Sequence, residues 1–226
     1  MSMQPIEWTG AGVILLIVLL LIIRKRLLKP TAIIIGLFIS IYTAYLGGIG
    51  SFIAIILFFL IGEFVTRVIR NKYYRKPHAI RSTVNIIGNI GPALIALMVN
   101  PVSFNVMFFA SLSAAFADTL SSEIGVLSKY KPLSIITLQP VETGTDGGVS
   151  LLGLMGALGG SIIFGLLAFI LTQNIFWGII ILLAGMMGSI FDSFLGATLQ
   201  KKGVLDNNST NFVSAFVIGL FFALAF

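Results

Sequence analysis

Long apolar runs constrain this chain more than any other feature of its sequence. The first, GVILLIVLLLII from Gly12 to Ile23, is followed by about seven more, separated by short polar stretches. Hydrophobic residues make up 58% of the 226 residues and charged residues only 10%, against about 25% charged residues in a soluble domain. In lipid, runs of this length satisfy their backbone hydrogen bonds as helices. The sequence therefore predicts an all-α fold, a polytopic transmembrane helical bundle.

The predicted bundle has about eight spans. They cover residues 11–23, 31–46, 51–66, 83–99, 104–120, 149–171, 175–191 and 210–226. The 24 glycines fit such a bundle because small residues let helices approach closely in lipid. We expect one membrane domain, in which residues 1–80 supply N-terminal helices with basic loops and residues 81–226 carry an acidic site.

Basic residues orient these spans. All 14 Lys and Arg residues fall in four connections, at 24–29, 67–81, 129–131 and 201–202. With eight spans and the N-terminus outside, these four connections share one face, and the positive-inside rule makes that face cytoplasmic. We therefore predict an integral protein of the cell membrane with its active site on the cytoplasmic face.

Composition excludes several kinds of chemistry. The chain has no cysteine and a single histidine, His78, so disulfides, thiolate metal sites and clustered histidine ligands are excluded. The net charge of +6 is spread over four membrane-edge loops, which argues against nucleic-acid binding. A basic face would instead attract a polyanionic substrate.

The acidic residues are concentrated in the second half. Six of the eight follow residue 117 and lie at the predicted cytoplasmic ends of spans or in the loops between them: Asp118, Glu123, Glu142, Asp146, Asp192 and Asp206. Such oxygen ligands, without Cys or clustered His, suit Mg²⁺, which usually shares its shell with substrate phosphates. The simpler interpretation is that individual acids cap helices or pair with Arg81 and the lysines.

Four polar patches carry these acids. They are FADTLSSEIG, LQPVETGTDGGVSLLG, GSIFDSFLGATLQ and LDNNSTN. The second, with threonines and paired glycines before a span, is typical of a backbone-amide nest for anions. AAFADTL and GSIFDSF are alike, either by chance or as a degenerate repeat that brings Asp118 and Asp192 to one site. On a helix, Glu123 lies about 140° from Asp118, so both serve one site only if the helix ends or bends near Ser121.

These patches resemble the DUF92 integral membrane family, which includes transmembrane protein 19 and the plant phytyl-phosphate kinase. The resemblance covers most of residues 81–226, and ETGTDGGVSLLG is its most specific string. RSTVNIIGNIG, which contains Arg81, Asn85 and Asn89, is similar to a weaker segment of the family.

The resemblance implies an isoprenoid-phosphate kinase. Such an enzyme transfers a phosphoryl group from CTP or another nucleoside triphosphate to a membrane prenyl (phytyl) monophosphate, with Mg²⁺ as cofactor, and homo-oligomerisation stays open. The expected catalytic and metal-binding residues are Asp118, Glu123, Asp146 and Asp192. The expected nucleotide- and phosphate-binding residues are Ser122, Lys129, Glu142, Thr143, Gly144, Thr145, Gly147, Gly148, Lys201, Asn207 and Asn208.

Two alternatives remain open at the level of sequence. A cytidylyltransferase that makes a CDP-activated lipid would use the same kinds of metal- and phosphate-binding groups. A lipid or ion transporter would use acids within the membrane to bind a coupling ion, although the acids gather at one predicted surface and no inverted repeat is evident.

Overall fold

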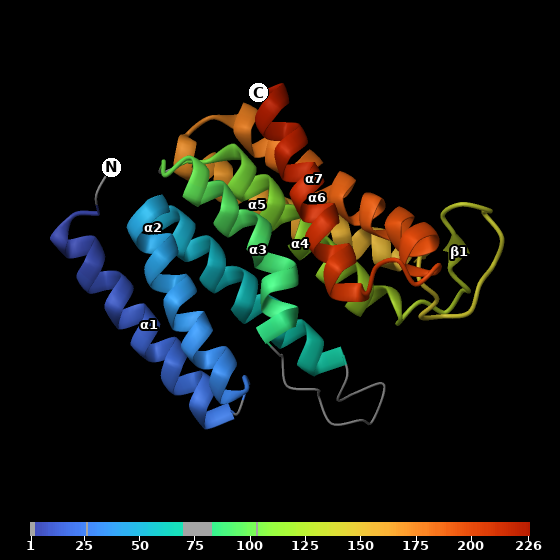
Figure 1. The fold of residues 1–226 in the computed structure, drawn as a ribbon, viewed down its shortest axis with the longest axis horizontal. Helices are drawn as coiled ribbons and strands as arrows, with labels where there is room; N and C mark the ends of the chain where they lie inside the picture. The colour runs from blue at the N-terminus through green and yellow to red at the C-terminus, as the bar shows by residue number, and fades with distance from the viewer. Residues whose placement is uncertain (1–2, 26, 70–82, 103) are drawn as a thin grey trace.

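The computed structural model describes residues 3–25, 27–69, 83–102 and 104–226, and these parts form a helical membrane bundle (Figure 1). Seven α-helices are described, with a short π-helical turn η2 (Gly196–Gln200) after the sixth. The helices are α1 (Pro5–Lys25), α2 (Pro30–Ile69), α3 (Thr83–Val99), α4 (Val106–Gly125), α5 (Leu151–Thr172), α6 (Ile175–Leu195) and α7 (Asn207–Ala225). The all-α membrane fold predicted from the sequence is therefore confirmed.

The predicted count of about eight spans is slightly higher than the described residues show, and α2 accounts for the difference. Two expected spans, 31–46 and 51–66, belong to this single 40-residue helix, which has a non-helical residue at Gly48 (φ 70°, ψ −172°). Figure 1 shows the two halves of α2 running in different directions from this bend. Five helices (α1, α2, α5, α6 with η2, and α7) are long and apolar enough to cross a membrane. The 17-residue α3 is shorter than that.

Helix α4 is the centre of the bundle. It packs against α2, α3, α5, α6 and α7, and its residues Phe108 to Ala117 are all buried. Glycines on its neighbours permit this packing: a Cβ on Gly188 of α6 would lie 2.2 Å from the Cβ of Ala114, and one on Gly156 of α5 would lie 2.7 Å from the Leu120 carbonyl oxygen. This is the close approach that small residues allow between helices in lipid.

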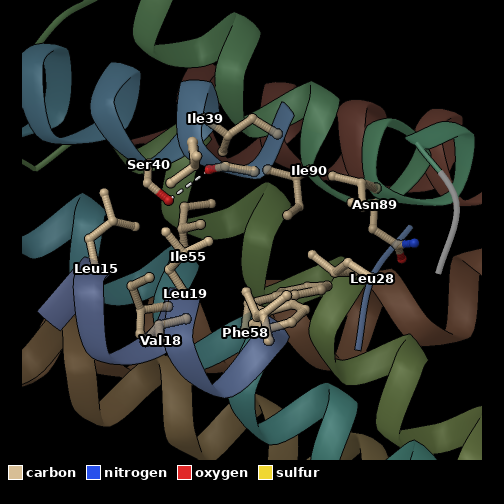
Figure 2. A pocket seen from close by; sticks show the side chains of 16 residues that line it. Leu15, Val18, Leu19, Leu28, Ile39, Ser40, Ile55, Phe58, Asn89 and Ile90 are labelled. Atoms are coloured by element: carbon tan, nitrogen blue, oxygen red, sulfur yellow. Dashed lines mark hydrogen bonds between the residues drawn. The ribbon is translucent and has the colours of Figure 1, made fainter. Parts of the chain in front are cut away.

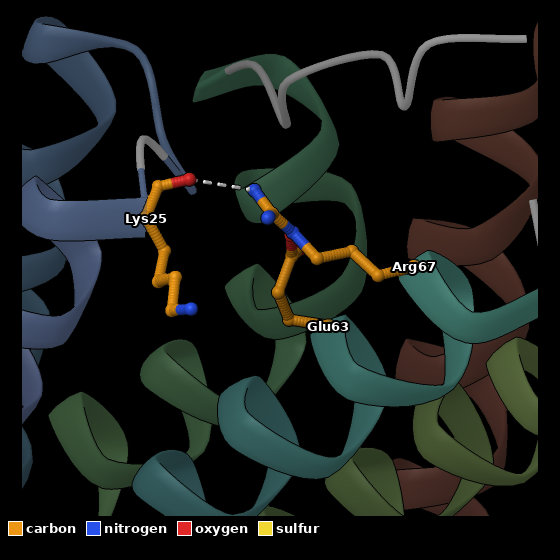
Figure 3. A network of polar contacts seen from close by, with 3 residues as sticks. All are labelled: Lys25, Glu63 and Arg67. Atoms are coloured by element: carbon orange, nitrogen blue, oxygen red, sulfur yellow. Dashed lines mark hydrogen bonds and ion pairs between the residues drawn. The ribbon is translucent and has the colours of Figure 1, made fainter. Parts of the chain in front are cut away.

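A polar contact ties α1 to α2 at their C-terminal ends. Arg67 Nε donates to Glu63 Oε1 at 2.9 Å, and Arg67 Nη2 donates to the Lys25 carbonyl oxygen at 3.1 Å (Figure 3). Glu63 is almost fully buried, so this pairing offsets the cost of placing its charge inside the bundle. The contact fixes where the predicted N-terminal helices meet.

The connection between α4 and α5 contains two short strands that the sequence did not predict. Strands β1 (Leu133–Ser134) and β2 (Gly148–Val149) pair antiparallel, with Leu133 opposite Val149. The strands have two residues each, too few for an alternating pattern to show in the sequence. Their pairing folds residues 133–149 into a hairpin beside the C-terminal end of α4 and the N-terminal end of α5 (Figure 1).

Candidate functional site

A polar pocket lies where α4 and α6 end and α5 and α7 begin. Its volume is about 260 Å³. The lining residues that the sequence predicted are Asp118, Ser122, Thr143, Gly144, Thr145, Asp146, Gly147, Gly148, Asp192 and Asn207. The structure therefore brings residues from four separate patches of the sequence to one place.

Three carboxylates from three different segments line this polar pocket. Asp118 comes from α4, Asp192 from α6 and Asp146 from the glycine-containing connection between α4 and α5. Asp118 and Asp192 are close enough to repel each other electrostatically, and Asp192 also interacts with Asp146. The two similar stretches AAFADTL and GSIFDSF thus deliver their aspartates to the same pocket, on neighbouring helices.

The connection at Thr143–Gly148 forms one wall of the pocket. Gly144 (φ 89°) and Gly147 (φ 73°) adopt the left-handed conformation, which glycine enters at no steric cost. The loop is held by hydrogen bonds from the Thr145 amide to the Glu142 carbonyl and from the Gly148 amide to the Thr145 carbonyl. The backbone amides of residues 143, 144, 146 and 147 donate no hydrogen bond within the described parts of the chain, so they can receive an anion.

Two helices begin at this pocket. Ser150, the N-cap of α5, accepts a hydrogen bond from the Gly153 amide and donates one to the Gly125 carbonyl. Asn207, the first residue of α7, lines the same pocket. Helix N-termini carry partial positive charge and unpaired amides, so the start of α5 favours a negatively charged group inside the pocket, whereas the start of α7 already has the Asp206 carboxylate as its N-cap.

Asp192 has a partner that sequence reasoning missed. Ser214 of α7 donates its Oγ hydrogen to Asp192 Oδ2 at 2.9 Å. Two further side-chain hydrogen bonds join α3 and α7. Asn211 donates to Asn89 at 3.3 Å, and Asn85 donates to Asn208 at 3.4 Å. A bond between residues 22 positions apart on different helices leaves no short-range signal in a single sequence.

Other pocket-lining residues were also outside the predicted set. They are Ser121, Gly125, Val126, Pro132, Ser150, Gly153, Ser193, Gly196 and Gln200. Ser193 has a signal, because a hydroxyl residue follows each of the paired aspartates in the sequence. At the other aspartate, the Thr119 hydroxyl instead donates to the Ala115 carbonyl of its own helix.

Five predicted site residues do not line the polar pocket: Glu123, Lys129, Glu142, Lys201 and Asn208. Glu123 follows Asp118 by five positions on an unbroken helix, which turns it to another face. Glu142 forms an ion pair with Lys131 at the exposed surface. Arg81, which the simpler interpretation pairs with the acids, lies outside the described residues.

The donor set of the polar pocket fits Mg²⁺ bound together with phosphate. Among the described residues, no group of three or more His, Cys, Asp or Glu side chains is arranged to hold a metal alone. Mg²⁺ does not require such a cage, because it usually takes one or two carboxylates and completes its shell with water and substrate phosphates. Asp118 and Asp192, with Asp146 nearby, supply carboxylates of this kind.

Two further cavities differ from the polar pocket in chemistry. The N-terminal cavity, about 60 Å³, lies among α1, both halves of α2 and α3, and its walls include Leu15, Ile55 and Phe58 (Figure 2). The apolar pocket, about 560 Å³, lies beside the polar pocket and shares Ser121, Ser150 and Ser193 with it.

Comparison with known proteins finds one matching family and several similar membrane or plant proteins. The family described as "Integral membrane protein DUF92" matches residues 13–219. An uncharacterized membrane protein of Methanocaldococcus jannaschii is 31% identical, with 97% of this chain and 94% of the relative covered. An uncharacterized membrane protein of Synechocystis is 30% identical, with 93% of this chain and 88% of the relative covered. Protein PGR of Arabidopsis thaliana is 34% identical over 48% of this chain and 50% of its own length. No solved structure matches.

Proposed function

We propose, from the premise that this chain belongs to the DUF92 family of integral membrane proteins, that its polar pocket is the active site of an isoprenoid-phosphate kinase. The phosphoryl donor is a nucleoside triphosphate, with CTP as the first candidate, and the acceptor is a prenyl monophosphate in the membrane. The pocket faces the cytoplasm in this proposal, because basic residues follow the C-terminal ends of α1, α2, α4 and α6.

The observation that carries the proposal is the charge arrangement of the polar pocket. Three carboxylates line it, and none of its described lining residues is Lys or Arg. A pocket of this kind repels a bare polyphosphate but accepts one that arrives with Mg²⁺. The free amides of residues 143, 144, 146 and 147 and the N-terminus of α5 would then bind the phosphate oxygens.

Each group has a role in positioning the reactants. Phosphoryl transfer requires in-line alignment and neutralised charge rather than covalent help from the protein. An oxygen of the acceptor phosphate attacks the γ-phosphorus, and the bond from that phosphorus to the β–γ bridging oxygen breaks, which releases the nucleoside diphosphate. The acceptor is already ionised, so no strong general base is needed.

Mg²⁺ held by Asp118 and Asp192 would supply charge neutralisation for the triphosphate. Ser214 would hold the Asp192 carboxylate in a fixed orientation through its hydrogen bond. Asp146 is exposed on the loop, where it would complete the site when the nucleotide binds.

Product analysis tests the proposal against its alternatives. Purified protein is incubated with Mg²⁺, each of the four nucleoside triphosphates and prenyl monophosphates of several chain lengths. A kinase produces prenyl diphosphate and a nucleoside diphosphate. Pyrophosphate together with a CDP-linked lipid would show a cytidylyltransferase. Flux into liposomes without nucleotide turnover would show a transporter, and Asp192→Asn provides the inactive control.

A further inference from the structure

We infer that the apolar pocket holds the hydrocarbon tail of a phosphate-headed lipid whose head group lies in the polar pocket. This inference rests on the proposed function and adds the path of the tail. The apolar pocket is lined by the connection between α4 and α5, the first turn of α5 and the last turns of α6. It lies directly beside the polar pocket, with which it shares three lining serines.

Continuity between the two pockets is the first argument. Ser121 of α4, Ser150 at the start of α5 and Ser193 of α6 line both of them. Beyond these serines the walls become apolar, with Val149, Leu154 and Ile190 among them. A molecule that lies across this boundary must have a polar end and an apolar end.

The outer wall supplies the second argument, because it exposes apolar side chains. Leu138 is 70% exposed and Leu151 is 76% exposed, and both line the apolar pocket. Tyr130 and Lys131 lie on the same rim, and such residues are typical of a membrane–water interface. The rim is therefore suited to contact lipid, from which a prenyl tail could enter sideways.

Backbone strain at Leu138 is the third argument. Its φ of 55° lies in the left-handed region, which is uncommon and strained for a residue other than glycine. The turn is closed by hydrogen bonds from the Leu138 amide to the Ser134 carbonyl and from the Ser134 amide to the Gln139 carbonyl. Asn or Gly would fit this conformation better, so a strained and exposed leucine points to a requirement for its side chain.

The N-terminal cavity is a poorer site for the tail. Its volume is about 60 Å³ against about 560 Å³ for the apolar pocket. The two cavities share no lining residue. The N-terminal cavity serves as the alternative location of the tail in the test.

Photolabelling combined with a tail-length assay tests the inference. The probe is farnesyl monophosphate with a diazirine at the far end of its tail, and the label is mapped by peptide sequencing. Ile190→Trp fills the apolar pocket. Ile179→Trp is the matched control, because it lies about three turns away on the same face of α6, is similarly exposed (51% against 44%) and does not line the pocket.

A second variant, Leu138→Asn, removes the apolar side chain and suits the left-handed backbone. The label should fall on residues 133–154 or 189–193, disappear in Ile190→Trp and persist in Ile179→Trp. Leu138→Asn should raise the KM for farnesyl monophosphate about tenfold and leave the KM for isopentenyl monophosphate unchanged.

Label around the N-terminal cavity would overturn the inference. It would also be overturned if labelling and tail-length dependence stayed unchanged in both Ile190→Trp and Leu138→Asn. Label in the apolar pocket without phosphorylation of any monophosphate would leave the tail site standing and refute the proposed kinase activity instead.

Discussion

Ser214 on α7 donates a 2.9 Å hydrogen bond to the Asp192 carboxylate on α6. Ser214 lies within a predicted apolar span and Asp192 directly follows another, and the bond fixes the orientation of the carboxylate at the polar pocket. We expect Ser214→Ala to lower turnover about tenfold, since hydrogen bonds to charged groups contribute about 1.5–3 kcal/mol. The measurement is specific activity per folded molecule.

The matched control for this change is Ser161→Ala. Ser161 is also a fully buried serine, but its hydroxyl donates within its own helix to the Ala157 carbonyl. Equal losses of activity in the two variants would show that any buried serine matters for packing, and that Ser214 does not position Asp192.

Asp118→Asn and Asp192→Asn test the metal–phosphate site. Each substitution removes a charge that neutralises Mg²⁺ with bound triphosphate, so turnover should fall by about 10², roughly 2.7 kcal/mol. The melting temperature should stay or rise, because the two carboxylates repel each other and a neutral amide costs less near hydrocarbon. Activity and melting temperature are measured on the same preparation.

A readout without catalysis supports the same test. Mg²⁺ with CTP should raise the melting temperature of the unaltered protein, and chelation with EDTA should abolish the rise. Both asparagine variants should lose it. A destabilised Asp118→Asn protein with normal turnover would make Asp118 a structural residue.

The sequence predicted the helices well because each apolar run is long and has a single stable state in lipid. It also placed Asp118 and Asp192 in one expected site, although it left open whether the two stretches are alike by chance, and both residues line the polar pocket. It failed where the answer depends on packing. The partner of Asp192 lies on another helix, 22 positions away, and the bend at Gly48 interrupts a run that reads as two separate spans. For Glu123 the open point was whether the helix ends near Ser121, and it continues to Gly125.

Gly144 and Gly147 should respond differently to alanine, although both have positive φ. A Cβ on Gly147 would lie 2.3 Å from the Cβ of Ala197 and 2.7 Å from its backbone, whereas nothing lies within 4 Å of a Cβ on Gly144. Gly147→Ala should therefore displace η2, which follows α6, and lower the melting temperature. Gly144→Ala should cost only about 1 kcal/mol of backbone strain and mainly weaken CTP binding.

Isothermal titration with CTP and Mg²⁺ and thermal unfolding separate these two effects. Unchanged CTP affinity in Gly144→Ala would place the phosphate site away from this loop. A stable Gly147→Ala protein would contradict the close packing of the loop against η2.

The orientation of the bundle predicts that single cysteines at Lys25, Lys131 and Lys202 share one side of the membrane. In Figure 1, α1, the second half of α2 and α6 all run toward the lower right, while α7 runs back. The native chain has no cysteine, so labelling with a membrane-impermeant maleimide before and after lysis reports each position cleanly. Arg75, expected on the same side, lies outside the described residues. Opposite labelling of Lys131 and Lys202 would exclude a shared site.

The cap of α7 predicts a pH dependence of stability. The Asp206 carboxylate accepts a hydrogen bond from the Ser209 amide at 2.7 Å, and this bond lowers the pKa of Asp206 below its usual value. Because the folded-state pKa is the lower one, the stabilisation is complete above the unfolded pKa of about 3.9 and is lost as the pH falls through the folded pKa.

Asp206→Asn keeps the cap, since Asn also accepts from helix amides, but cannot titrate. Melting temperatures from pH 6 to pH 2 should therefore fall more steeply for the unaltered protein than for Asp206→Asn, while activity at pH 7 is equal. Parallel curves would show that the cap contributes nothing to the acid sensitivity of the fold.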